Sequence, residues 1–202
     1  MLKLYHSAQS RSVRPRWLLE EVGAPYDLVR LDFSKQEHKT PGYLQIHPHG
    51  VVPALVDGDL KLMESAAICA YLADKFPAAR LAPPVGTPDR GRYYQWMVYA
   101  VATLEPPLMQ VFMHTVRLPE AERSARVADE GRTKFGEAAE VIAGGLTGKA
   151  FLLGEQLSAA DVMIGSTLVW SQFMGLLNSR PALGEYVQRL MSRPAYQRAF
   201  AD

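Results

Sequence analysis

A proline at the entrance of an apolar strand constrains the fold of this chain more than any other residue. Pro53 lies within Val51-Val52-Pro53-Ala54-Leu55, a run typical of a buried strand. Because proline has no N–H to donate, we expect it at the first strand residue or at a bend, after an extended Val52. A cis Val52–Pro53 bond would free the backbone N–H and C=O of Val52 to pair with a small peptide ligand.

Strand and helix patterns alternate up to about residue 76. Asp57-Gly58-Asp59 favours a hairpin turn between two of the strands. The order β-α-β, loop, β-β-α, with Pro53 opening the third strand, predicts a thioredoxin-like α/β domain over residues 1–76. Strands are expected at residues 2–5, 27–31, 52–56 and 60–63, and helices at residues 13–22 and 65–75.

The chain changes character at residue 77, where prolines and a glycine crowd together and predict a linker over residues 77–88. Every later segment has helical periodicity, so residues 89–202 are predicted to form an all-helical domain. Ser158 and Asp161 have the spacing of a capping box at one helix start. Helices are expected at residues 89–103, 120–146, 159–177, 183–191 and 195–200.

Composition argues against several classes of protein. The 202 residues include 22 basic and 21 acidic ones, and a formal charge of +1 gives no general attraction to nucleic acid or anionic membrane. No apolar run approaches the ~20 residues of a membrane span. The single cysteine, Cys69, allows no internal disulfide, and the chain starts with a strand pattern, so we expect a cytoplasmic protein. His47 and His49 lack further ligands, so no metal site is expected.

A second candidate binding element follows the hairpin. Ser65 stands where a helix is expected to begin, which favours a role as N-cap, and Glu64 precedes it. A helix N-terminus attracts a carboxylate, and the carboxylate of Glu64 attracts an ammonium group. Together they fit the head group of an α-amino acid, although Glu64 alone would also fit a solvated charge.

Three motifs carry a resemblance to a known family: Gln36-Glu37-His38-Lys39, His47-Pro48-His49-Gly50-Val51-Val52-Pro53-Ala54-Leu55 and Met63-Glu64-Ser65-Ala66-Ala67-Ile68. With them the whole chain resembles a cytosolic glutathione transferase, of a bacterial serine type similar to the theta, phi and beta classes. The resemblance implies a detoxifying homodimer that uses glutathione as co-substrate and no metal. Its first domain would bind glutathione, and its helical domain would line a hydrophobic substrate site.

The resemblance also implies how glutathione is held. The γ-glutamyl head group would meet Glu64 and Ser65, and the cysteinyl backbone would pair with Val52 beside its proline. His38 and Lys39 match a His-Lys pair near the glycyl carboxylate in the family. For Lys39 a solvated charged loop is the alternative.

The glutathione thiol must be activated near the end of the first strand, where several polar residues are available. An N-cap at Ser12 keeps Pro15 in the tolerant first turn of the helix, which gives Ser12 a structural role. An ungapped match to the family puts Ser10 at or beside its catalytic serine or cysteine. Ser7 and Arg11 are the alternatives, with Tyr5 a weaker one, and Arg11 would also add positive charge beside glutathione.

The second substrate is expected on the first helix after the linker. Tyr99, Thr103 and Pro106 fall on one face at helical spacing, a stripe that is also typical of ordinary core. By the resemblance this helix faces the thiol. With Met109 and Met113 the stripe would then form an adaptable apolar wall for a small hydrophobic electrophile.

The predicted function is therefore conjugation of glutathione to a hydrophobic electrophile. A glutathione-dependent isomerase, dehalogenase or peroxidase is an alternative, because the same activated thiol serves each reaction. A non-catalytic interaction protein of the same fold is an alternative of another class. Retention of Ser10, Pro53, Glu64 and Ser65 argues against that last alternative.

Overall fold

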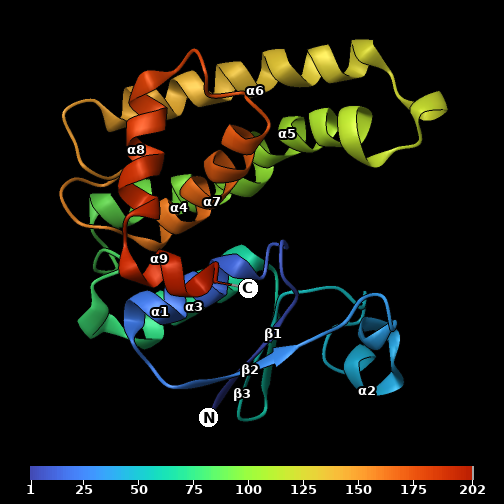
Figure 1. The fold of residues 1–202 in the computed structure, drawn as a ribbon. Coiled ribbons are helices and arrows are strands. Elements are labelled where there is room, and N and C mark those ends of the chain that lie inside the picture. Colours follow the sequence, from blue (N-terminus) through green and yellow to red (C-terminus); the bar gives the residue numbers. More distant parts are fainter. Residues whose placement is uncertain (202) are drawn as a thin grey trace. The chain divides into compact units, whose positions relative to one another are not determined.

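The computed structural model describes residues 1–201 and divides into two compact units (Figure 1). Unit 1 combines Met1–Ala82 with the described residues from Met191 onward, and unit 2 is Pro83–Leu190. This division differs from the expected helical domain over residues 89–202. The reason is that the last helix, α9 (Pro194–Ala199), packs against α1 (Val13–Val22) of unit 1.

Unit 1 is built on a mixed sheet with the strand order β2-β1-β3-β4. Its strands are β1 (Leu2–His6), β2 (Tyr26–Arg30), β3 (Ala54–Asp57) and β4 (Leu60–Met63), and α3 (Ser65–Lys75) follows β4. β1 is parallel to β2 and antiparallel to β3, which is antiparallel to β4. The predicted thioredoxin-like order is confirmed. β3 begins at Ala54, later than expected, because Pro53 cannot donate to the ladder.

The two faces of β1 carry different side chains. Leu2, Leu4 and His6 are buried on one face, and His6 contacts α1 there. Figure 1 shows α1, α3 and α9 gathered on one side of the strands. On the opposite face Tyr5 packs against Tyr43 of α2 (Pro41–Leu44), with ring centroids 5.2 Å apart. Alternation along the strand thus directs His6 toward the helices.

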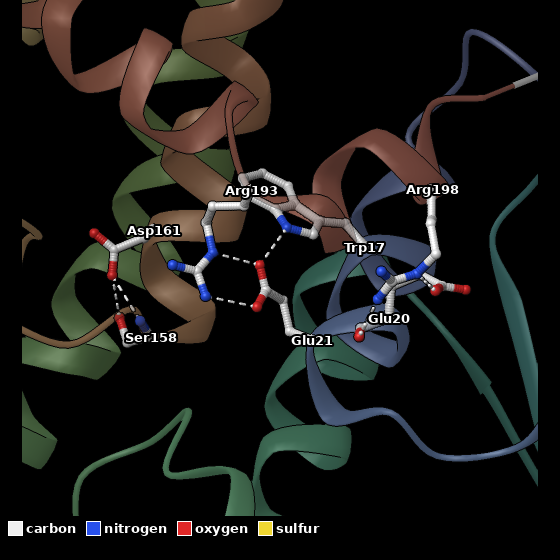
Figure 2. A network of polar contacts seen from close by, with 7 residues as sticks. All are labelled: Trp17, Glu20, Glu21, Ser158, Asp161, Arg193 and Arg198. Atoms are coloured by element: carbon white, nitrogen blue, oxygen red, sulfur yellow. Dashed lines mark hydrogen bonds and ion pairs between the residues drawn. The ribbon is translucent and has the colours of Figure 1, made fainter.

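The C-terminal segment is held on α1 by aromatic and ionic contacts. Trp17 is fully buried and meets the ring of Tyr196 edge to face, at 5.1 Å between centroids. Arg193 donates from Nε and Nη2 to the two carboxylate oxygens of Glu21, at 2.6 and 2.8 Å (Figure 2). Trp17 Nε1 donates to the same carboxylate at 2.9 Å. These contacts explain why the end of the chain belongs to unit 1.

Unit 2 is all-helical, as predicted. Helical structure runs without a break from residue 88 to residue 117, past residue 103, where the first helix was expected to end. Pro106 and Pro107 have no N–H for the regular ladder, and the wider π-helical turn η3 precedes them. The elements are α4 (Pro88–Tyr99), η3 (Ala100–Leu104), α5 (Glu105–Phe112), η4 (Met113–Arg117), α6 (Ala125–Leu146), α7 (Ala159–Phe173) and α8 (Pro181–Met191).

The start of α7 carries the predicted capping box. Ser158 donates from its backbone N–H and its Oγ to Asp161 Oδ2, at 2.8 and 2.7 Å (Figure 2). The backbone N–H of Leu152 and the hydroxyl of Tyr186 donate to Asp161 Oδ1. Burial raises the pKa of the Asp161 carboxyl, and these donors oppose the shift. No helix within the described residues is long and apolar enough to cross a membrane.

Candidate functional site

The loop between β1 and α1 is folded around its own serine hydroxyls. Ser10 Oγ lies 2.6 Å from Ser12 Oγ and donates to the carbonyl oxygen of Ser7 at 2.7 Å. The backbone N–H of Ser12 donates to Ser10 Oγ, and that of Ser7 donates to Ser12 Oγ, both at 3.2 Å. Gln9, with a φ of 55°, makes the left-handed turn that brings the serines together. Ser10 is half-buried, so solvent still reaches this residue.

Ser12 occupies the predicted N-cap position of α1, but its side chain makes no capping hydrogen bond. Its φ and ψ of −68° and −13° are already helical, and its hydroxyl turns back toward the strand. There Ser12 Oγ lies 2.8 Å from Nδ1 of His6. Ser12 is fully buried, which leaves Ser10 as the more accessible of the two paired hydroxyls.

His6 lies behind the serines and was not singled out from the sequence. It is 2% exposed, and its Nε2 lies 3.3 Å from Nη1 of the buried Arg16. Burial, together with the charges of Arg16 and Arg30, lowers the pKa of His6 to about 4, against an opposing hydrogen bond with the Ser12 backbone. The ring is therefore neutral at pH 7. A polar residue at a buried position of an alternating strand, just before the serine loop, was the available signal.

Glu64 and Ser65 form the turn from β4 into α3. Glu64 occupies the N-cap position with φ 70° and ψ 114°, a backbone conformation that costs free energy outside glycine. Ser65 is the first residue of the helix, so the expected N-cap role of Ser65 was wrong. Because β4 ends at Met63, Glu64 has to make the turn. The Ser65 hydroxyl instead accepts a hydrogen bond of 3.2 Å from Nη1 of Arg14, which is 3% exposed.

Arg14 is a second residue that sequence reasoning missed. It comes from α1, and its guanidinium reaches the first turn of α3. A buried cation beside a helix N-terminus adds positive charge where unpaired N–H groups already attract anions. The Glu64–Ser65 turn thus combines an exposed carboxylate with an electropositive helix end.

Three strands bring the separate segments to one end of the sheet. Tyr5 pairs with Ala54, and Ala54 pairs with Met63. The residues next along the chain are therefore neighbours: the serine loop after β1, the Val52–Pro53 bond before β3, and Glu64 after β4. The Val52–Pro53 bond is cis. The structure thus gathers three of the segments that the sequence analysis singled out.

His38 and Lys39 lie in the short 3-10 turn η1 (Glu37–Lys39). The buried ring of His38 stacks on Phe33 at 4.0 Å between centroids, and its Nδ1 has no hydrogen-bond partner among residues 1–201. Lys39 Nζ is exposed and donates to the carbonyl oxygen of His49 at 2.9 Å. A Cβ on Gly50, whose φ is 56°, would lie 2.5 Å from the His38 carbonyl oxygen, so this turn and the loop at residues 47–50 are tightly packed.

The predicted electrophile-binding residues lie within unit 2. Tyr99 is half-buried and donates its hydroxyl to the carbonyl oxygen of Ala138 on α6 at 3.2 Å. Thr103 and Pro106 are exposed, and Met109 is half-buried, as is Met113. The π-helical turn η3 interrupts the regular spacing from which a single stripe was predicted, because each of its turns holds more residues.

Cys69 is a core residue, and the described part of the chain groups no set of metal ligands. Cys69 is fully buried, and burial raises the pKa of its thiol to about 12, so it behaves as a small core residue. Within residues 1–201, no three His, Cys, Asp or Glu side chains are grouped in a way that could hold a metal ion.

Two family models match the chain. The model described as "Glutathione S-transferase, N-terminal domain" matches residues 1–74, and "Glutathione S-transferase, C-terminal domain" matches residues 104–194. A probable glutathione S-transferase, GSTF2, of Oryza sativa subsp. japonica is 34% identical, with 98% of this chain and 94% of the relative covered. The glutathione S-transferase GST-4.5 of Xanthomonas campestris pv. campestris is 29% identical, with 98% and 97% covered.

Solved glutathione transferase structures superpose on almost the full length of this chain. A ternary complex of BphK, a bacterial glutathione transferase, superposes with a TM-score of 0.87 at 30% identity, covering 98% of both chains. Glutathione S-transferase-I bound with lactoylglutathione gives a TM-score of 0.84 at 30% identity, covering 99% of this chain and 98% of the other. A sphingomonad glutathione S-transferase complexed with glutathione gives 0.85 at 28% identity, covering 98% and 97%.

Proposed function

The chain belongs to the glutathione S-transferase family, and on that premise we propose that Ser10 activates the thiol of bound glutathione for transfer to an electrophile. The protein is a transferase with glutathione as its co-substrate. The observation that carries the assignment of Ser10 is its half-buried hydroxyl, in the loop at the sheet end where Val52 and Glu64 also lie.

The proposed glutathione site uses the groups at that sheet end. The γ-glutamyl carboxylate binds the N-terminus of α3 at Ser65, where Arg14 supplies positive charge, and Glu64 pairs with the ammonium group. The cysteinyl backbone pairs with Val52, next to the cis bond to Pro53.

The glycyl carboxylate is assigned to His38 and Lys39. The unpartnered, buried Nδ1 of His38 supports its part in this assignment, because a buried polar atom calls for a partner. The exposed Lys39 adds a cation at the same turn while its Nζ holds the carbonyl of His49. Arg11 is exposed in the serine loop and supplies a cation near the thiol.

Ser10 lowers the thiol pKa by donating a hydrogen bond to the thiolate. A free thiol has a pKa of about 8.5, and lowering it by ~2 units requires roughly 2.7 kcal/mol. A hydrogen bond to a charged acceptor contributes about 1.5–3 kcal/mol, so one hydroxyl supplies most of the effect. The thiol proton passes to solvent. The sulfur lone pair then forms the C–S bond, while the leaving group departs with the electrons of its bond to carbon.

The electrophile is proposed to be small and hydrophobic and to bind along the helical segment from α4 to η4. Its wall would consist of Tyr99, Thr103, Pro106, Met109 and Met113, which combine apolar surface with flexible thioethers. Replacing both methionines with alanine should raise KM for a hydrophobic electrophile several-fold and leave the Kd of glutathione unchanged. An unchanged KM would remove this wall from the proposal.

The thiol assignment is tested by Ser10→Ala with Ser7→Ala as the matched control. Ser7 contributes its backbone N–H and C=O to the loop, so Ser7→Ala retains these hydrogen bonds. Conjugation of glutathione to a chlorinated dinitrobenzene should fall about 10- to 100-fold in Ser10→Ala, matching the loss of one hydrogen bond to a thiolate. The Kd of glutathione, measured by calorimetry, should stay within a few-fold. Loss of turnover in Ser7→Ala alone would instead identify Ser7 as the activator.

The proposed assembly is a homodimer, and the proposed compartment is the cytoplasm. Family membership supports both, and the one cysteine, which is buried, requires no oxidising environment. Light scattering after size exclusion should give twice the 22.4 kDa mass of the chain. A monomer mass at micromolar concentration would contradict the dimer.

A further inference from the structure

A chain of side-chain hydrogen bonds links His6, Ser12 and Ser10, and each member donates to the next. We infer that His6 and Ser12, held by Arg16, are positioning residues that leave the Ser10 hydroxyl with one role, donation of its proton to the glutathione thiolate. We call the His6–Ser12–Ser10 chain the serine relay. This inference rests on the proposed function of Ser10 and adds the side chains that orient its proton.

The tautomer of His6 sets the direction. Arg16 can only donate, and its Nη1 lies 3.3 Å from His6 Nε2, so Nε2 must be the acceptor. The ring is neutral at pH 7 because burial and two arginines lower its pKa to about 4. A neutral imidazole carries one proton, which therefore lies on Nδ1. That N–H donates to Ser12 Oγ at 2.8 Å.

Ser12 accepts the hydrogen bond from His6 and donates one toward Ser10. A hydroxyl has two acceptor sites and one donor. Ser12 Oγ accepts from His6 Nδ1 and from the Ser7 backbone N–H, which fills both acceptor sites. Ser12 must then donate its own proton, and the nearer of its two possible acceptors is Ser10 Oγ at 2.6 Å, with the carbonyl oxygen of Ser7 at 3.1 Å.

Ser10 is the last member of the relay. Its Oγ accepts from the hydroxyl and from the backbone N–H of Ser12. With both acceptor sites filled, Ser10 can only donate, which is the property that a thiolate requires. Without glutathione this proton is shared with the carbonyl oxygen of Ser7 at 2.7 Å. A bound thiolate carries a full negative charge and competes for the same proton.

Substitutions in the relay should act on the thiol and not on binding. His6→Leu removes the Nδ1 donor, whereas His6→Asn keeps an N–H at a similar position. Ser12→Ala breaks the next link. We expect His6→Leu and Ser12→Ala to raise the pKa of bound glutathione, followed by thiolate ultraviolet absorbance, and to lower kcat several-fold at pH 6.5. His6→Asn should lie close to the wild type, and the Kd of glutathione should stay within about two-fold in all three.

A double-mutant cycle separates the relay from a general structural role. In a Ser10→Ala background, His6→Leu should cause no further change in the thiol pKa or kcat, because its effect passes through Ser10. An equal effect of His6→Leu in both backgrounds would overturn the relay. If Ser10→Ala itself leaves the thiol pKa unchanged, the proposed function of Ser10 fails and the relay with it. If Ser10→Ala raises that pKa but Ser12→Ala and His6→Leu do not, only the relay fails.

A measurement on the unaltered protein guards against variants that do not fold. Nitrogen-15 NMR of the wild-type imidazole distinguishes its two neutral tautomers and its protonated form. At pH 7 we expect His6 to be neutral with its proton on Nδ1. A proton on Nε2, or a doubly protonated ring, would overturn the inference without any substitution.

Discussion

Acidification should destabilise this protein through His6. Burial, Arg16 and Arg30 lower the pKa of His6 to about 4 in the fold, whereas an unfolded histidine titrates near 6.5. Between these values the unfolded chain binds a proton that the folded chain excludes. The free energy of unfolding therefore falls as the pH falls, by up to about 1.4 kcal/mol per pH unit. From pH 7 to pH 4.5 the loss due to His6 is about 2 kcal/mol.

The assay is denaturant unfolding of the wild type and His6→Asn at several pH values. The difference in unfolding free energy between the two proteins isolates the contribution of His6. Partners lower the pKa values of Glu20 and Asp57, so their protonation in acid destabilises both proteins equally and cancels in the difference. The stability of the wild type relative to His6→Asn should fall by about 2 kcal/mol between pH 7 and pH 4.5. Parallel pH profiles for the two proteins would refute the reasoning.

Three further substitutions test packing and polar contacts away from the serine relay. Arg193→Lys keeps the charge but loses the bidentate contact with Glu21. It should lower the free energy of unfolding by about 1 kcal/mol and speed amide hydrogen exchange in α9. Unchanged exchange would show that this ion pair does not hold the helix. Tyr186→Phe removes a buried hydrogen bond to Asp161 and should cost about 1.5–3 kcal/mol in thermal unfolding, and a variant of wild-type stability would contradict that role. Gly131→Ala would place a methyl group 2.8 Å from a carbonyl oxygen of α5. The crowding should cost about 1–3 kcal/mol, which outweighs the ~1 kcal/mol gain in helix propensity, so the melting temperature should fall. A raised melting temperature would show that α5 moves to accommodate the methyl group.

Elements specified by their own residues were predictable. The helix at Val13–Val22 ends at Gly23, whose φ of 70° suits glycine, and the hairpin turns at Asp57-Gly58. The capping box at Ser158 depends on a spacing of three residues along the chain. Such features are local, so periodicity and turn chemistry were enough for the order of strands and helices in unit 1 and for the helical character of unit 2.

Helix boundaries and contacts between distant residues were harder to predict from the sequence, because they depend on which polar groups pair in the folded chain. The helix through Pro106 continues because a π-helical turn accommodates the missing N–H, an adjustment that spacing alone does not reveal. The end of the chain joins unit 1 through Arg193, whose partner Glu21 is 172 residues away. The helix start at Ser65 was predicted correctly, but the N-cap is Glu64 and not Ser65.

The sequence by itself determined the segments of the proposed glutathione site: the serine loop, Val52–Pro53 and Glu64–Ser65 are each recognisable as short motifs. Tertiary structure alone decided their surroundings. His6 became a neutral, directional donor because α1 buries it beside an arginine, and Arg14 reached Ser65 from another helix. Burial and contacts between distant residues set protonation, tautomer and hydrogen-bond direction, and these properties exist only in the folded chain.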